Sequence, residues 1–530
     1  MRDVVIVGAG HNALVAACYL ARAGLDVEVV ERDRIVGGAC STVERFPGYQ
    51  VDRGSSAHIM VRHTGIVEDL RLEECGLRYL DCDPWAFAPF RTDDGQQAIT
   101  FSTDLARTCN SIADVCGDRD ADAYAAFAKD WGERNRKIFE AFQDPPTMRN
   151  LGHRLWNVGR STGQKGPELA RQFLQPADAL LDATFTDERL KTALSWLGAQ
   201  AGPPTHEVAT ADLVGWNMVM HHLPPGRPVG GSGVLSEALA TRFRSYGGTL
   251  RLGDAVTAIT SQGARVTGVR TESADRIDAE RVLAGCHVLT TVRLLDDQAL
   301  LADALKRIRV GNGIGMVVRL GTRDLPRYPS APADGSAHQG LQLLARDRNQ
   351  LRAAYGDFGA GVPPREPAVL AMTFSAVDPT IAPPGKHNVS LWSQWHPYAL
   401  SNGEAWDAIR DREADKIIAQ VERLAPGFTD SIEHRFAQTP LDLERELGLL
   451  RANVMHVEMG LDAMFSLRPV PEWATYRGPR DGLYLTGAST HPGGGVFGAS
   501  GRSAARAILA DRAGSRRARV ARRVKSTLRT

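Results

Sequence analysis

A glycine-rich turn close to the N-terminus carries the most specific chemical signal in the sequence. Gly8, Gly10 and Ala13 occupy the three positions of the pattern G-x-G-x-x-G/A, with His11 and Asn12 between them. In that pattern the first position permits a tight turn, the second lets backbone approach a pyrophosphate, and the third allows close packing. We expect a helix to start here and to hold phosphates through its free N–H groups and its dipole.

The residues around this turn predict one β-α-β unit that positions it. The apolar run 4–7 indicates a buried strand, 14–23 a helix that ends at Gly24, and 27–30 a second strand. Glu31 follows the second strand, where a carboxylate can accept hydrogen bonds from both hydroxyls of a ribose. The same charge disfavours a 2′-phosphate, so the sequence predicts a dinucleotide other than NADP.

Two further glycine segments could belong to the same site. Gly37-Gly38 would let the chain fold back beneath a cofactor, as in flavoproteins of the glutathione-reductase-like kind, although an ordinary two-glycine turn fits as well. Near the C-terminus, 482–495 indicates a buried strand and a glycine-rich loop, followed by a helix over 501–509. Such a loop presents bare N–H groups to a flat or anionic ligand, and packing alone is the alternative. The following helix would stabilise negative charge on a reduced flavin.

Composition narrows the class of protein. The 530 residues, 43% of them hydrophobic, exceed a typical single domain several-fold and exclude a disordered, collagen-like or coiled-coil chain. A net charge of +1 gives no reason to expect nucleic acid. The seven cysteines form no Cys-x-x-Cys pair and the histidines show no metal-ligand spacing, so we expect no metal and a reducing, cytoplasmic setting. The sequence shows neither a signal-peptide pattern nor a run of about 20 apolar residues.

Several segments together resemble one known family. The stretch 8–17, Glu31-Arg32 and 36–39 are similar to the opening of the FAD-dependent phytoene desaturase (carotenoid desaturase) superfamily. His11-Asn12 and the segment 46–55 resemble the branch of pyridine nucleotide-disulfide oxidoreductase domain-containing protein 2. The segments 227–233 and 482–495 also match, the latter resembling the second FAD motif of the superfamily. The sequence after 295 follows the desaturase pattern loosely.

The resemblance implies FAD as the cofactor and assigns residues to it. A strand at 255–259 would contact the adenine through Val256. The expected FAD-binding residues are Gly8, Gly10, His11, Asn12, Ala13, Glu31, Arg32, Gly37, Gly38, Ala39, Ser55, Val256, Gly487, Ala488, Pro492, Gly494, Gly495 and Val496.

The expected fold class is α/β, with a Rossmann-type FAD-binding domain of glutathione-reductase-like kind and an interleaved mixed α/β substrate domain. We assign 1–110, 225–295 and 476–511 to the FAD-binding domain, and 111–224 and 296–475 to the substrate domain. In the substrate domain we expect helices at 122–142, 167–197 and 404–424, and strands at 312–320, 369–374 and 388–392. Aromatic residues there could form a substrate cavity or simply the core: Trp216, Trp392, Trp395, Tyr398, Phe465 and Trp473.

The tail 512–530 carries eight basic residues and no acidic one. If it is helical, Val520, Val524 and Leu528 form a thin apolar stripe, which allows peripheral contact with anionic lipid. A disordered basic tail explains the same residues.

The expected reaction is removal of a hydride from a lipophilic substrate, isoprenoid or secondary-metabolite, to flavin N5 with loss of a proton. His491, inside the second FAD segment, and His58, beyond the segment 52–54, are the candidate bases, with a structural role as the alternative for each. Oxygen or a quinone would be the electron acceptor.

Two other functions fit the same cofactor site. An amine oxidase of related fold would place an aromatic pair at the flavin. Because the last cysteine is Cys286, a cysteinyl flavin link in the second FAD segment is excluded. The third hypothesis is a redox-inactive flavoprotein that binds lipid or a partner protein as a scaffold.

Overall fold

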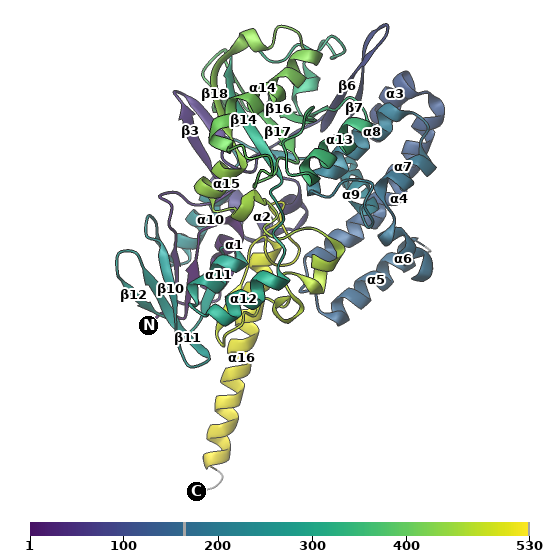
Figure 1. The fold of residues 1–530 in the computed structure, drawn as a ribbon. Coiled ribbons are helices and arrows are strands. Elements are labelled where there is room, and N and C mark those ends of the chain that lie inside the picture. The colour runs from purple at the N-terminus through teal and green to yellow at the C-terminus, as the bar shows by residue number, and fades with distance from the viewer. Residues whose placement is uncertain (163–165, 528–530) are drawn as a thin grey trace.

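In the computed structural model, which describes residues 1–162 and 166–527, the first strand lies at the centre of a parallel sheet (Figure 1). The sheet is buried, and its β-branched strands match the two-sided burial of parallel sheets. The predicted strands at 4–7 and 27–30 are confirmed. In spatial order the five strands are β19 (Leu483–Leu485), β13 (Val282–Ala284), β1 (Val4–Val7), β2 (Val27–Val30) and β9 (Thr249–Arg251).

Different layers cover the two faces of this sheet. One face packs against α1 (His11–Arg22), α10 (Val234–Ser245) and the start of α16 (Ala499–Thr527). On the other face the core includes the antiparallel strands β10 (Val256–Gln262), β11 (Arg265–Thr271) and β12 (Arg276–Asp278), followed by α11 (Val288–Leu294) and α12 (Gln298–Arg307). This is the α/β arrangement of a Rossmann-like dinucleotide-binding domain.

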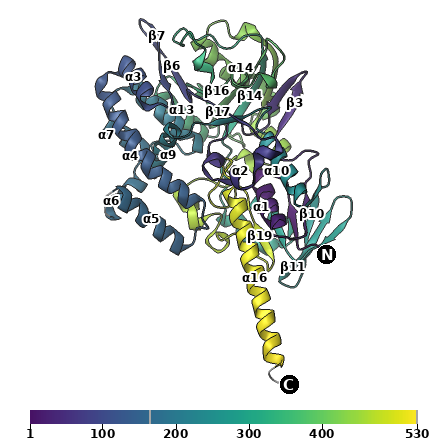
Figure 2. The same cartoon turned by 180° about the vertical axis from the view of Figure 1, so that it is seen from behind.

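Helix α16 is longer than the predicted helix over 501–509. Its second half extends away from the rest of the molecule in both views (Figures 1 and 2). The backbone of the basic tail is therefore helical as far as Thr527. Residues 528–530 and the side chains of 515–527 lie outside the described part of the chain, so the predicted stripe of Val520, Val524 and Leu528 also lies outside it.

A second, mixed sheet forms the other half of the molecule. Its order is β18 (Ile432–Gln438), β14 (Gly315–Thr322), β17 (His387–Gln394), β16 (Val369–Met372), β15 (Leu341–Leu344), β6 (Ala86–Thr92) and β7 (Gly95–Phe101). Neighbours are antiparallel except β15 and β6. Helix α14 (Trp406–Leu424) packs on one face, and α13 (Arg348–Gly359) packs with the helical part on the other.

The helical part comes from the segment between β7 and β8 in the sequence. The expected helix 167–197 is divided into α6, α7 and α8, whereas the expected helix 122–142 lies within α4. The helices are α3 (Leu105–Cys116), α4 (Asp118–Phe142), α5 (Met148–Thr162), α6 (Gly166–Leu174), α7 (Ala177–Thr184), α8 (Glu188–Gly198) and α9 (Ala211–Gly215).

Short elements connect these parts. They are β3 (Thr42–Phe46) paired with β4 (Tyr49–Asp52), β5 (Tyr79–Asp81) paired with β8 (Gly226–Pro228), and the helices α2 (Ile66–Asp69) and α15 (Pro440–Leu447).

One predicted domain boundary needs correction. We placed 1–110 in the FAD-binding domain, but β6 and β7 belong to the seven-stranded sheet. The reason is pairing over a long sequence distance: Ala86 and Phe87 of β6 lie beside Leu341 and Gln342 of β15. A periodicity within 86–101 cannot reveal a partner strand so far along the chain.

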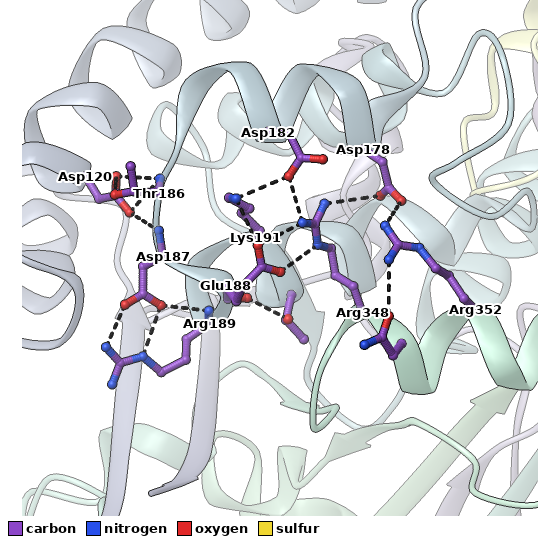
Figure 3. Close-up of polar contacts among 12 residues, drawn as sticks. Asp120, Asp178, Asp182, Thr186, Asp187, Glu188, Arg189, Lys191, Arg348 and Arg352 are labelled. Carbon is purple, nitrogen blue, oxygen red and sulfur yellow. Dashed lines mark hydrogen bonds and ion pairs between the residues drawn. The ribbon is translucent and has the colours of Figure 1, made fainter.

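An ion-pair network joins the helical part to the seven-stranded sheet (Figure 3). Buried Arg348, at the start of α13, donates to Asp182 of α7 at 2.7 Å and to Glu188 of α8 at 2.9 and 3.1 Å. Lys191 approaches the same two carboxylates at 3.2 and 2.9 Å. Because Arg348 is buried and contacts both helices, it fixes α7 and α8 relative to α13.

We expect Arg348→Ala to lower the stability of the protein by about 2 kcal/mol. The loss is below that of a fully buried ion pair, because the Asp182 and Glu188 side chains are 51% and 61% exposed. Urea unfolding of both proteins measures it. Arg327→Ala is the control, since Arg327 is 82% exposed and pairs only with Asp324; an equal effect of the two substitutions would contradict the role of the network.

No helix within residues 1–162 or 166–527 is both long and apolar enough to cross a membrane. Over the same residues, no three His, Cys, Asp or Glu side chains come together as metal ligands.

Candidate cofactor-binding site

A cavity of about 480 Å³ lies between the two sheets and beside the carboxyl ends of β1 and β2. Every residue predicted to bind the cofactor lines this cavity except Pro492. The lining residues among them are Gly8, Gly10, His11, Asn12, Ala13, Glu31, Arg32, Gly37, Gly38, Ala39, Ser55, Val256, Gly487, Ala488, Gly494, Gly495 and Val496. The fold thus brings the N-terminal turn and the C-terminal glycine segment to one enclosed space.

The N-terminus of α1 has the properties of an anion site. Gly10 is its N-cap, no side chain caps it, and its first turn contains no acidic residue. The side-chain amide of Asn12 donates to Nε2 of His11 at 2.9 Å, while Asn12 Oδ1 is buried without a partner in the described structure. A Cβ placed on Gly10 would meet nothing within 4 Å. The open space and the uncapped N–H groups fit a bound pyrophosphate, whereas Asn12 Oδ1 is an acceptor and would need a donor.

Glu31 is held in place at the end of β2. Its Oε2 accepts the Ala9 N–H at 2.6 Å and its Oε1 accepts the Asp33 N–H at 2.9 Å. Each oxygen keeps a further lone pair, so the carboxylate can still accept hydroxyl hydrogen bonds on the cavity side. This geometry suits a ribose.

The segment 446–456 forms a wall that the sequence did not predict. It follows no cofactor motif, yet Glu446, Leu447, Gly448, Leu449, Val454, Met455 and His456 all line the cavity. The backbone here is strained: Arg451, Ala452 and His456 have φ values of 52°, 56° and 65°. Val496, which also lines the cavity, has a φ of 58°, which is unfavourable for a β-branched residue. Such strain collects at functional sites.

His456 is oriented on this wall by three contacts. Its Nδ1 lies 3.0 Å from Ser489 Oγ, its carbonyl accepts from His287 Nε2 at 2.9 Å, and the two imidazoles stack at 5.0 Å. Because Ser489 Oγ accepts the Val288 N–H at 3.0 Å, its hydroxyl proton can go to Nδ1 of His456. The proton of His456 is then on Nε2, which has no partner within the described residues. Burial lowers its pKa well below the usual value, so His456 is a neutral donor.

Neither histidine predicted as a base lines the cavity. His491 is buried among the rings of Phe142 and Phe465, and its Nε2 has no partner within the described chain. Burial lowers its pKa to about 4. His491 does not line this cavity in the structure, and its role as the base stays a prediction. Pro492 lies beside it, which explains why this residue is also absent from the wall.

His58 lies behind Ser55, in a network of hydrogen bonds. Its Nδ1 is 2.8 Å from Tyr79 Oη and its Nε2 is 3.0 Å from Ser232 Oγ. The Ser232 hydroxyl in turn contacts the Ser55 hydroxyl, which does line the cavity. Burial, with the nearby charge of Arg227 and other groups, lowers the pKa of His58 to about 3. These contacts favour a structural histidine, and the role of His58 as a base stays a prediction.

These buried histidines predict a loss of stability in acid. Burial lowers the pKa of His491 to about 4 and of His58 to about 3, whereas an unfolded histidine titrates near 6.5. The unfolded chain therefore binds more protons below pH 6.5. The stabilisation is complete above pH 6.5 and is lost as the pH falls toward 4 and 3, by up to about 3 kcal/mol for His491.

Urea midpoints at pH 7.5, 6.5, 5.5 and 4.5 check this expectation. His58→Gln should make the decline shallower, because one histidine no longer titrates. A midpoint that is constant between pH 7 and pH 5 would contradict it.

The far end of the cavity is formed by the other sheet. Leu370 of β16 and Trp392 of β17 line it, together with Gln200 and Leu449. Of the six aromatic residues proposed for a substrate wall, Trp392 is the one on the cavity. Trp395 and Trp473 are buried core residues, and Tyr398 packs against the cluster of Leu443, Leu449 and Ala452. Trp216 and Phe465 belong to the ring cluster around Phe139, Phe142 and His491.

Known proteins share this architecture. Residues 6–70 match the model of the NAD(P)-binding Rossmann-like domain. Pyridine nucleotide-disulfide oxidoreductase domain-containing protein 2 of Mus musculus is 33% identical, over 96% of this chain and 93% of that protein. A phytoene dehydrogenase of Streptomyces griseus is 28% identical, over 83% of this chain and 82% of its own.

Among solved structures, putrescine oxidase bound to putrescine has the same fold, with a TM-score of 0.61 at 14% identity over 97% of this chain and 99% of that one. The identity to the mouse protein, across nearly the full length of both chains, establishes the relationship. The chain belongs to the oxidoreductase family of pyridine nucleotide-disulfide oxidoreductase domain-containing protein 2, which is related to the phytoene dehydrogenases and desaturases.

Proposed function

We propose that this protein is an FAD-dependent oxidoreductase that desaturates or dehydrogenates a lipophilic substrate, isoprenoid or a secondary metabolite. One observation carries the proposal: a single cavity extends from the dinucleotide turn at Gly10 to the apolar side chains of Leu370 and Trp392. A cofactor held at one end of this cavity would share the space with an apolar ligand at the other.

Several features favour FAD and a domain of the glutathione-reductase-like kind. Gly37 and Gly38 lie on the cavity wall beneath the turn at Gly10, and the Gly37 N–H donates to the Ala9 carbonyl at 2.8 Å. Val256, at the start of β10, also lines the cavity, as an adenine contact requires. Residues 8–13 would hold the pyrophosphate and Glu31 a ribose, with 487–496 facing the rest of the cofactor.

FAD, when bound, would supply a hydride acceptor at N5. The chain itself would exclude water and position the substrate, which are the main contributions of a protein to cofactor chemistry. Leu370, Trp392 and Leu449 give the substrate an apolar contact surface. His456 presents a neutral N–H to the cavity, and His287 holds its backbone. No histidine predicted from the sequence as a base has access to the cavity.

The cavity distinguishes this proposal from an amine oxidase. That alternative requires a pair of aromatic rings at the flavin. Among the described lining residues, Trp392 is the single Phe, Tyr or Trp. The lining of the cavity therefore favours a lipophilic substrate over an amine, which would be held between two aromatic rings.

The purified protein should be yellow and should release FAD on denaturation, without reduction of the flavin by NADH or NADPH. Under anaerobic conditions a lipophilic substrate should bleach the flavin, and reoxidation by oxygen or by a quinone then identifies the acceptor. A protein that binds no FAD after reconstitution would overturn the proposal. Bound FAD that neither lipophilic compounds nor amines reduce would favour the scaffold function instead.

A further inference from the structure

A buried arginine lies between the two loops that line the cavity. Arg468 has 0% exposure, and its partners among the described residues are all main-chain carbonyls. Its Nη2 donates to Met455 at 2.5 Å and to Ala488 at 2.7 Å, and both acceptor residues line the cavity. The remaining acceptors are the carbonyls of Val457, Glu458 and Ala463 at 3.1 to 3.2 Å.

The charge of this guanidinium has no acidic partner. Within residues 1–162 and 166–527 no carboxylate lies within 4.0 Å of Arg468, whereas buried Arg227 pairs with Asp52. Burial lowers the pKa of Arg468 to about 9, so it remains charged at neutral pH. Burying a charge is costly unless another charge or a ligand compensates it.

The carbonyls around Arg468 supply partial negative charge, and an anionic ligand in the cavity would supply a full one. Burial, and to a smaller extent the charge of Arg468, lowers the pKa values of His287, His456 and His491, so these histidines are neutral. Met455 and Ala488 lie between the guanidinium and the cavity: their carbonyls accept from Arg468, and both residues line the cavity. In such an environment of low dielectric, the field of an unpaired charge extends further than in water.

We propose that Arg468 is the counter-charge for an anionic group of the bound cofactor, and this rests on the proposed binding of FAD. The anion is either the diphosphate or the isoalloxazine ring once it is reduced. Arg468 does not touch the cavity, so it acts as a positioning residue: it holds the two loops together and places a positive charge behind them.

Two substitutions separate the charge from the hydrogen bonds. Arg468→Lys keeps the charge and loses most carbonyl contacts, while Arg468→Gln keeps donors and loses the charge. FAD titration of the apoproteins gives the dissociation constants, and spectroelectrochemistry gives the midpoint potential. We expect the Lys variant to bind FAD within about threefold of the parent. The Gln variant should bind FAD at least about tenfold more weakly, either in both redox states or in the reduced state alone.

The redox state identifies the anion. If it is the diphosphate, Arg468→Gln weakens oxidised and reduced FAD equally. If it is the reduced ring, only the reduced form is weakened, and a tenfold effect lowers the midpoint by about 30 mV for a two-electron couple. Equal FAD affinities and equal midpoint potentials in the Lys and Gln variants would show that Arg468 acts through its hydrogen bonds alone. That result would overturn the proposal. A parent protein that binds no FAD would instead overturn the proposed function.

If both variants fail to fold, a pair at Ala463 tests the same charge. Ala463 is buried, does not line the cavity, and its carbonyl accepts from Arg468. Ala463→Asp should neutralise the guanidinium without removing it and so weaken FAD binding about tenfold. Ala463→Asn, of the same size and uncharged, is the control. Equal FAD affinity and potential in this pair would contradict the proposal.

Discussion

Gly10→Val is expected to lower the affinity for FAD at least about 100-fold while leaving the protein folded. A Cβ at Gly10 would meet no described protein atom within 4 Å, since the space beside Gly10 is the cavity itself. It would occupy the volume where the pyrophosphate must approach the backbone. Gly10 has a φ of −64° and a ψ of 155°, which valine also adopts, so the stability cost should be about 1 kcal/mol or less.

Fluorescence titration of apoprotein with FAD and thermal unfolding without FAD measure the two effects separately. Gly10→Ala provides a graded control with a smaller loss of affinity. If the valine variant bound FAD as the parent does, the turn at 8–13 would not be the pyrophosphate site.

Gly501→Ala is expected to have the largest effect on the fold. A Cβ at Gly501 would lie 2.0 Å from the Asn12 carbonyl oxygen and 3.1 Å from the Ala16 N, both backbone atoms of α1. Neither can move away by a side-chain rotation, so α16 must separate from α1. We expect a loss of about 3 kcal/mol or more, and weaker FAD binding because Asn12 lies on the cavity wall.

Gly514→Ala in the same helix is the matched control. No atom lies within 4 Å of a Cβ there, so alanine should stabilise the helix by up to about 1 kcal/mol. Thermal unfolding of the two variants therefore shifts in opposite directions. A neutral Gly501→Ala would contradict the close contact of α1 and α16.

The local elements around the cofactor turn could be predicted because their signals are local. Strands at 4–7 and 27–30 are short β-branched runs, and the structure places β1 and β2 at those residues. In the second half of the chain, the strand expected at 369–374 is β16 and the helix expected at 404–424 is α14, each shifted by two residues at most.

The wall formed by 446–456 could not be predicted, because tertiary contacts fix it. His456 adopts a φ of 65° where Arg468 binds the neighbouring carbonyls and His287 binds its own. Arg468 and His287 both lie more than ten residues from His456 in the sequence, and no regular spacing connects them to it. His58 and His491 lie close in sequence to the cofactor motifs, but both are buried and neither lines the cavity.

The structure of the protein crystallised with FAD tests the central claim most directly. We predict one FAD per chain, with atoms within hydrogen-bond distance of the turn at 8–13 and of the segment 487–496. A structure with FAD bound to only one of these segments, or bound elsewhere on the molecule, would contradict the account.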